Sequence, residues 1–317
     1  MQDKLLQFFS YFQNVSNKKK FFELQNVHKK KLSKKEILFL KNINNQLSIQ
    51  EVINIYLPLS NLLNFYINFN YLQKKYFNKI FKGIYKFSPY IIGICGSIAV
   101  GKSTTAKILK ILLKRKIKNY RVEIITTDNF LYSNEFLKKK KLMKKKGFPE
   151  TYKIKELVNC ILKLKSGFPY IDTPFYSKMQ YDIVPNKKII IQKPNVLILE
   201  GINILYKYRL NNRINKISLS DLIDFSIYID APEKFLKNWY INRFIKICKN
   251  SFYNAASYFH KYSFLSKREI RQIASSIWNQ TNRKNLRINI LPNKENASLI
   301  LKKKSDHNIE NMRIKNR

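Results

Sequence analysis

The sequence predicts an α/β fold in which a doubly wound, mostly parallel sheet is flanked by helices and preceded by a helical N-terminal segment. Three observations predict this fold. Short apolar runs are typical of buried strands, helical patterns alternate with them, and a glycine-rich loop joins the first run to a helix. The 317 residues are enough for one large domain with a substantial core.

The N-terminal third is expected to be helical after a basic arm. Residues 1–32 are rich in lysine and predict a loosely ordered segment. Ser33 is a suitable N-cap for a helix, because the apolar residues after it are spaced three and four apart. A second helical region follows Ser48, and Pro58 requires a kink or a boundary within it. We expect the main domain to span 33–308 and a charged tail to occupy 309–317.

Four apolar runs mark the expected strands. The first lies at 90–95 between a proline and a glycine, which is typical of a buried strand. The other three lie at 121–127, 195–201 and 225–230. Helical patterns are found at 103–113 and 155–164, and Pro232 suits the first turn of a further helix. Because strands alternate with helices, we expect parallel pairing.

Charge is the unusual property of the composition. With 61 Lys and Arg against 20 Asp and Glu, the formal net charge is +41, which invites a nucleic-acid or anionic-membrane interpretation. However, residues with A/T-rich codons (Lys, Asn, Ile, Tyr, Phe) are abundant throughout, whereas Gly and Pro number only 7 and 9. Mutational drift toward A and T explains both trends, so we expect no specific nucleic-acid partner.

Cysteine usage and hydropathy favour a cytoplasmic protein. The three cysteines are far apart and form no CxxC pair, and the N-terminus does not resemble a signal peptide. The longest uncharged stretch, 52–73, contains Pro58 and several Asn and Gln residues, so it is a poor membrane span. The three histidines, His28, His260 and His307, have no metal-ligand spacing. We therefore expect no membrane association.

The strongest local signal is GSIAVGKS at 96–103, a full match to the phosphate-binding pattern G-x-x-x-x-G-K-[ST]. Its two glycines let the backbone turn N–H groups toward phosphate oxygens. Its lysine is expected to reach the β- and γ-phosphates and its last serine to ligate Mg²⁺. The pattern predicts ATP and Mg²⁺ as cofactors, bound by Gly96, Ser97, Ile98, Ala99, Val100, Gly101, Lys102 and Ser103.

Three further charged residues are candidates for the same chemistry. Asp128 follows the strand at 121–127, where a carboxylate can take a proton from a substrate hydroxyl. Glu200 ends the run LILE and resembles an acid that holds Mg²⁺ directly or through water. Arg243 lies on the helix after Pro232, where a kinase lid carries phosphate-binding arginines. The alternatives are ordinary loop acids and a solvated arginine, and the lysine run 138–146 is either a solvated face or an attractor of anionic substrates.

With these residues in view, the chain resembles the type I (bacterial, P-loop) pantothenate kinases over about 33–307. The resemblance rests on GSIAVGKSTTAK, ITTDNFL, LMKKKGFPETY, PFYSKMQYDIVP, LILEGINIL, WYINRF, SYFHKY and NILPNKENASLIL. It implies a P-loop kinase fold and ATP-dependent phosphorylation of pantothenate to 4′-phosphopantothenate, the first step of coenzyme A synthesis. It also implies a homodimer that coenzyme A inhibits in competition with ATP.

The resemblance implies a role for each matching residue. Asp128 would be the base or the hydroxyl-orienting group, Lys102 would stabilise the transferring phosphoryl group, and Arg243 would contact phosphates. Ser103 and Glu200 would serve Mg²⁺. Tyr176, Tyr240 and Asn282 would hold pantothenate, and Phe244, Phe252 and Phe259 would form an apolar wall. Asn44, Lys303 and His307 would lie near the adenine.

Two positions depart from the family pattern. Lys178 stands where the family usually has His, and it can only donate hydrogen bonds, although its cation can still meet the pantothenate carboxylate. Lys107 stands where Arg is usual and replaces a bidentate phosphate fork with a point charge. Both changes bear on inhibition by coenzyme A more than on catalysis.

Three alternative functions are weighed against this one. A sibling kinase, such as a uridine kinase or a phosphoribulokinase-like enzyme, would share the loop and Asp128, but the segments around Tyr176, Tyr240 and Asn282 argue against it. A basic nucleic-acid-binding NTPase is disfavoured because the basic runs are scattered along the chain. A decayed, non-catalytic remnant is disfavoured because the phosphate loop and both acids are retained together.

Overall fold

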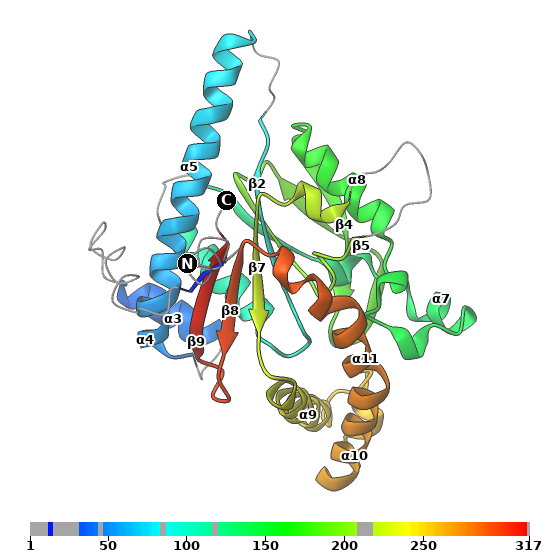
Figure 1. Ribbon diagram of the computed structural model, residues 1–317. Coiled ribbons are helices and arrows are strands. Elements are labelled where there is room, and N and C mark those ends of the chain that lie inside the picture. The colour runs from blue at the N-terminus through cyan, green and yellow to red at the C-terminus, as the bar shows by residue number, and fades with distance from the viewer. Residues whose placement is uncertain are drawn as a thin grey trace, which may run out of the picture.

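The computed structural model describes residues 12–14, 32–43, 47–82, 87–115, 120–207 and 218–315. Its centre is a seven-stranded sheet in the order β1-β9-β8-β7-β2-β6-β3 (Figure 1). The strands are β1 (Phe12–Asn14), β2 (Tyr90–Gly96), β3 (Val122–Thr126), β6 (Val196–Glu200), β7 (Phe225–Asp230), β8 (Leu299–Lys303) and β9 (Ile309–Lys315). The five strands from β8 to β3 pair in parallel, and β9 and β1 are antiparallel additions at one edge.

All four predicted strands are confirmed, as β2, β3, β6 and β7. Every residue of β2 is buried, which fits its central place between β6 and β7. The predicted helices are confirmed as α6 (Lys102–Lys114), α8 (Ile154–Lys165) and α9 (Glu233–Asn250). The α/β fold with a mostly parallel sheet is therefore confirmed, and its carboxyl edge carries the loops that follow β2, β3 and β6.

The N-terminal helices begin where the sequence places them. Helix α3 (Lys34–Ile43) has a capping box, because the Ser33 hydroxyl accepts from the Glu36 backbone N–H and the Glu36 carboxylate accepts from the Ser33 N–H. A short helix α4 (Ile49–Glu51) and a π-helical turn at Val52–Tyr56 lead into the long helix α5 (Leu57–Ile80). Pro58 lies in the first turn of α5, so it marks a boundary.

Helix α5 both supports the core and projects from it. The Tyr56 hydroxyl, just before α5, lies 3.2 Å from the Thr105 hydroxyl on α6. The C-terminal half of α5 extends beyond the sheet (Figure 1). Within the described part of the chain, no helix combines the length and the apolarity that a membrane crossing requires.

Several elements have no counterpart in the sequence predictions. A separate hairpin consists of β4 (Tyr170–Ser177) and β5 (Asp182–Gln192), and α10 (Lys267–Ile277) leads through π-helical turns to α11 (Arg283–Asn285). Residues 309–315, expected in a charged tail, form β9 instead, which pairs antiparallel with β8 and buries Ile309 and Met312. Of the arm at 1–32, the described residues are 12–14, which form β1, and residue 32.

Candidate active site at the carboxyl ends of the parallel strands

The phosphate loop joins β2 to α6 in the predicted place. Gly96 and Gly101 have φ values of +142° and +102°, which L side chains rarely adopt. A Cβ added to Gly96 would lie 2.5 Å from the carbonyl oxygen of Ile229 on β7, so glycine is needed where the two strands meet. The Lys102 Nζ donates to the Ser97 carbonyl oxygen at 2.7 Å and lies over the loop. The loop thus has the form that cradles phosphate.

Ser103 and Glu200, the two predicted Mg²⁺ ligands, lie in direct contact. The Ser103 hydroxyl donates to Glu200 Oε1 at 2.8 Å, which joins the start of α6 to the end of β6. Glu200 is 7% exposed, and its Oε2 is buried without a hydrogen-bond partner in the described residues. A hydroxyl and a carboxylate with spare acceptor capacity are hard oxygen ligands, which fit Mg²⁺.

Asp128 lies next to this pair, on a 3₁₀ turn (Thr127–Phe130) that follows β3. Burial raises the pKa of Asp128, the Glu200 carboxylate raises it further, and Lys102 among other lysines lowers it. Burial also lowers the pKa of Lys102, against the opposing effects of Glu200 and Asp128, and the cation of Arg243 lowers it further. The structure therefore brings together two acids and two cations, in an arrangement able to accept a proton beside bound phosphates.

The predicted substrate residues divide into two groups. Tyr240, Phe244 and Phe259 are buried and in ring contact, with centroids of Phe244 and Phe259 5.8 Å apart. Asn282 lies beside Tyr240, and its side-chain hydrogen bond opposes the rise that burial causes in the pKa of Tyr240. Phe252 is 46% exposed, and its ring contacts are with two other aromatic residues outside this wall.

Lys146 and Tyr181 lie against the predicted substrate residue Tyr176, although the sequence analysis did not single them out. The Lys146 Nζ donates to Asn134 Oδ1 at 2.6 Å and to the Tyr181 carbonyl oxygen at 2.5 Å. It lies 4.0 Å from the Tyr181 ring centroid and 5.2 Å from that of Tyr176, which is buried. Burial lowers the pKa of Lys146 to about 8, although Asp182 and Asp128 oppose this effect. The two residues lie in the segments LMKKKGFPETY and PFYSKMQYDIVP, but neither segment alone distinguishes Lys146 or Tyr181 from its neighbours.

The predicted adenine and regulatory residues are spread around the loop. Lys303 is buried on β8, and its Nζ would lie 2.9 Å from a Cβ on Gly101. The His307 ring stacks on Trp239 with centroids 3.9 Å apart. Asn44 lies outside the described residues. Lys107 and Lys178 are exposed, and Lys178 is close enough to Asp128 to lower its pKa.

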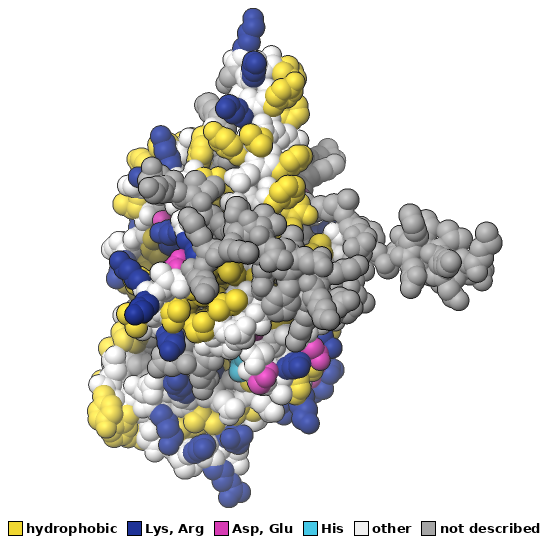
Figure 2. Space-filling view, turned by 90° about the vertical axis from the view of Figure 1, so that its left-hand side faces the viewer, with side chains coloured by type: hydrophobic (Ala, Val, Ile, Leu, Met, Phe, Trp, Pro, Cys, Tyr) yellow, Lys and Arg dark blue, Asp and Glu magenta, His cyan; other side chains and the backbone are white. Residues whose placement is uncertain are grey.

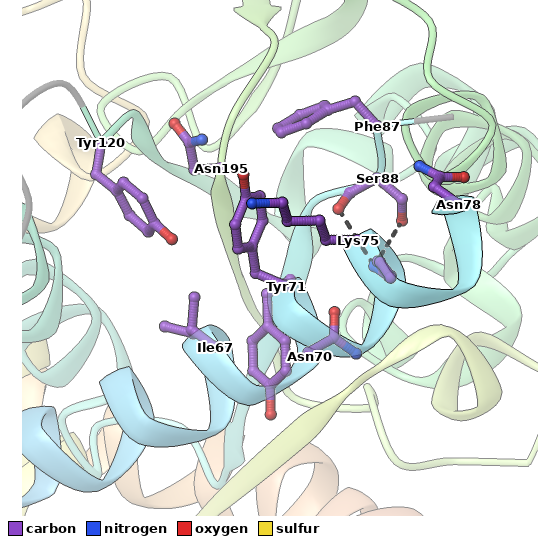
Figure 3. A pocket seen from close by; sticks show the side chains of 11 residues that line it. Ile67, Asn70, Tyr71, Lys75, Asn78, Phe87, Ser88, Tyr120 and Asn195 are labelled. Atoms are coloured by element: carbon purple, nitrogen blue, oxygen red, sulfur yellow. Dashed lines mark hydrogen bonds between the residues drawn. The ribbon is translucent and has the colours of Figure 1, made fainter. Parts of the chain in front are cut away.

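A cavity of about 250 Å³ lies at the opposite, amino edge of the sheet (Figure 3). It is lined by one face of α5 and by residues at the starts of β2, β3 and β6, and includes none of the predicted site residues. The Lys74 Nζ donates there to the Ser88 carbonyl and hydroxyl oxygens at 3.3 and 3.4 Å. The predicted catalytic residues therefore lie at the carboxyl edge, away from this cavity.

Comparisons with known proteins agree with this geometry. Residues 91–247 match the Phosphoribulokinase / Uridine kinase family model. The chain is 48% identical over 300 residues to a pantothenate kinase of Sodalis glossinidius (strain morsitans), covering 94% of this chain and 95% of the relative. It is 46% identical over 285 residues to a pantothenate kinase of Photorhabdus laumondii, covering 90% of each. Among solved structures, the YGR205w protein matches with a TM-score of 0.51 at 17% identity, covering 80% of this chain and 99% of that one, which supports the fold alone.

Proposed function

This chain belongs to the pantothenate kinase family, and on that basis we propose that it transfers the γ-phosphoryl group of ATP to the primary hydroxyl of pantothenate. The product would be 4′-phosphopantothenate, in the first step of coenzyme A synthesis. The observation that carries the proposal is the convergence of the phosphate loop, Asp128 and Glu200 beside Tyr240 and Asn282.

The nucleotide would bind across the loop at 96–103. Its backbone N–H groups and Lys102 would hold the phosphates, with Lys107 at the edge of the loop. Ser103 and Glu200 would hold Mg²⁺, which neutralises charge on the β- and γ-phosphates when bound. Lys303 lies against the loop and His307 stacks on Trp239, so both support an adenine site there, and Asn44 is proposed from the resemblance alone.

Asp128 would accept the proton of the primary hydroxyl as the hydroxyl oxygen attacks the γ-phosphorus. A new O–P bond forms, the bond between the γ-phosphorus and the β,γ-bridging oxygen breaks, and ADP leaves. Lys102 and Arg243 supply positive charge where the transferring group carries negative charge. Lys146, which interacts electrostatically with Asp128, would hold the substrate hydroxyl end from the opposite side.

Pantothenate would lie between the β4–β5 hairpin and α9. Tyr176, Tyr240 and Asn282 offer hydroxyl and amide groups, and Phe244 and Phe259 offer a buried apolar wall. Phe252, at 46% exposure, is proposed only at the rim of this site. Lys178, an exposed cation near Asp128, would meet the substrate carboxylate.

We also propose a cytoplasmic homodimer with coenzyme A as a feedback inhibitor. One face of α5 carries exposed apolar side chains spaced four, three, four and four residues apart, and Figure 2 shows hydrophobic side chains along the projecting part of the helix. They are Phe65, Phe69, Leu72, Tyr76 and Ile80, each 55% to 68% exposed. This spacing keeps them on one stripe, which suits packing against the same stripe of a second copy.

The decisive experiment measures ATP consumption by the purified protein with Mg²⁺ and pantothenate, with uridine and single-stranded DNA in parallel. We expect stimulation by pantothenate alone. Stimulation by uridine would instead favour the sibling kinase, whose family model matches residues 91–247. Stimulation by DNA would favour a nucleic-acid-dependent NTPase, and no stimulation by any of the three would contradict an active enzyme.

A further inference from the structure

We infer that Asn203 and Asn285 are positioning residues of this kinase, because together they fix the Gly147 carbonyl and thereby set Lys146 against the substrate site. The inference rests on the proposed function, in which Lys146 acts beside Asp128. It assigns a role to two neutral side chains that do not themselves reach the reacting atoms.

Both amides donate to the same carbonyl oxygen. Asn203 Nδ2 lies 2.9 Å and Asn285 Nδ2 lies 2.8 Å from the Gly147 oxygen. Asn203 is 4% exposed and Asn285 is 6% exposed, so water does not readily replace either donor. A carbonyl oxygen has two lone pairs, and here both are used by side chains remote in the sequence. This arrangement determines where the peptide between Gly147 and its successor lies.

Further bonds hold the same turn. Gly147 has a φ of +97°, and its N–H donates to the hydroxyl of Thr151, which is fully buried. Asn289 Nδ2 donates to Asn285 Oδ1 at 2.8 Å, which leaves the Asn285 nitrogen to face Gly147. The Thr281 hydroxyl donates to the Lys144 carbonyl oxygen at 2.9 Å and attaches the loop at a second point.

The two amides join the loop to the segments that carry the other site residues. Asn203 lies three residues after Glu200, and Asn285 lies three residues after Asn282. Lys146 directly precedes the fixed carbonyl, and its ammonium lies between Asn134 and the Tyr181 ring. Because a lysine side chain is long and flexible, the place of its charge depends on the place of its backbone. The two amides therefore fix the position of Lys146 relative to both the proposed cation site and the proposed pantothenate site.

The test is a double-mutant cycle between Asn285→Ala and Lys146→Met. In the otherwise unchanged protein, we expect Asn285→Ala to lower kcat/KM for pantothenate about 10- to 100-fold, since small misplacements of a site group have effects of this size. The KM for ATP should stay near that of the control, whereas the Tm should fall moderately, because Asn289 Nδ2 loses its acceptor. In the Lys146→Met background, Asn285→Ala should cost about twofold or less, because the group through which it acts is gone.

The matched control is Asn293→Ala. Asn293 lies on the same C-terminal segment and its Nδ2 donates to the Asn289 carbonyl oxygen at 2.9 Å, so it loses a comparable bond without touching the loop. Asn203→Ala provides an independent second cycle if the Asn285 variant does not fold. Equal losses in both Lys146 backgrounds, or an equal loss in Asn293→Ala, would overturn the inference. Normal activity of Lys146→Met would contradict the role of Lys146 itself, whereas absence of pantothenate-stimulated ATP consumption in the parent protein would contradict the proposed function.

Discussion

The two edges of the parallel sheet both hold a lysine whose pKa is lowered by burial, yet only one edge has the features of a catalytic site. At the carboxyl edge, Lys102 interacts with Glu200 and Asp128 and lies over the phosphate loop. At the amino edge, Lys74 donates to the Ser88 oxygens, and Asp224 opposes the effect of burial on its pKa. Burial of a lysine is therefore common to both edges and does not identify the site.

The acids at the two edges differ in how completely they are satisfied. Both Asp224 oxygens accept from Lys165 Nζ, at 2.8 and 2.7 Å, and one also accepts from the Ile91 N–H at 2.7 Å. Glu200 instead keeps one buried oxygen without a partner in the described residues. A buried carboxylate oxygen without a hydrogen-bond partner can bind a ligand, whereas an acid whose oxygens are all hydrogen-bonded has a structural role. Between these two edges, the unsatisfied carboxylate oxygen distinguishes the candidate site, whereas a buried lysine does not.

Replacing the lysine at each edge tests this comparison most strongly. Lys102→Met should lower kcat by about 10³-fold, because a preorganised cation at the transferring phosphoryl group is lost. Lys74→Met, the matched substitution, should change kcat by less than about twofold, since it leaves the carboxyl edge intact. Steady-state kinetics with ATP and pantothenate would measure both. A comparable loss in the two variants would remove the distinction between the edges.

Asp128→Asn should lower turnover by at least about 10²-fold, because the amide cannot accept the hydroxyl proton. ATP binding should stay nearly intact, since Asp128 lies beside the loop and not within it. Nucleotide titration and kcat measurements on the same preparation would check both parts. Near-normal turnover would remove Asp128 from the proposed mechanism.

At the amino edge, Leu72→Glu should break the proposed homodimer and leave the chemistry in place. Leu72 is 60% exposed on the apolar stripe of α5, so the folded monomer tolerates a carboxylate there. A dimer would have to bury two such charges, which should raise its dissociation constant about 10²-fold. Sedimentation at several concentrations would measure the change, with Lys75→Glu, which lies off the stripe and lines the amino-edge cavity, as a control. Unchanged association would exclude this stripe as the interface.

The effect of Lys146 should be visible as opposite pH dependences of kcat/KM and of the stability of the fold. Its pKa of about 8 means that its cation is lost as the pH rises through 8, and kcat/KM for pantothenate should then fall about tenfold per unit. The unfolded chain binds the proton more tightly, with a pKa near 10.5, so stability should rise over the same range. A falling rate with a steady or rising Tm is thus expected, and the decline should be absent in Lys146→Met. A decline that persists in that variant would assign the ionisation to another group.

The smallest expected effect is regulatory. Lys178→His restores the side chain usual in the family at this exposed position, and it should strengthen inhibition by coenzyme A by about three- to tenfold, because imidazole can both donate and accept hydrogen bonds. Inhibition curves at fixed ATP would measure it, with Lys107→Arg as a companion that restores a bidentate fork. Identical curves for parent and variant would refute the regulatory interpretation of Lys178.

Local patterns in the sequence predicted the parts of the molecule that local interactions determine. The apolar run that forms β2, the loop at 96–103 and the acids after β3 and β6 depend on neighbouring residues, so they were found. The hairpin β4–β5 and strand β9 mix apolar with charged residues, so their strand pattern is weaker than the continuous apolar runs of β2 and β6. Lys146 could not be told from its neighbours, because the amides that fix its turn lie 56 and 138 residues from Gly147.

The pairing of β1 with β9 has a consequence for the integrity of the sheet. Residues 12–14 lie alongside 313–315, so these two segments from opposite parts of the chain pair at one edge of the sheet. An open strand edge is a template for unwanted association with other chains, and short edge strands limit that danger. A protein that began after Asn14 would expose the backbone of β9 in place of a three-residue strand, and would be more prone to aggregate without any change at the phosphate loop. Residues 12–14 of the basic N-terminal segment therefore protect the edge of β9 from pairing with other chains.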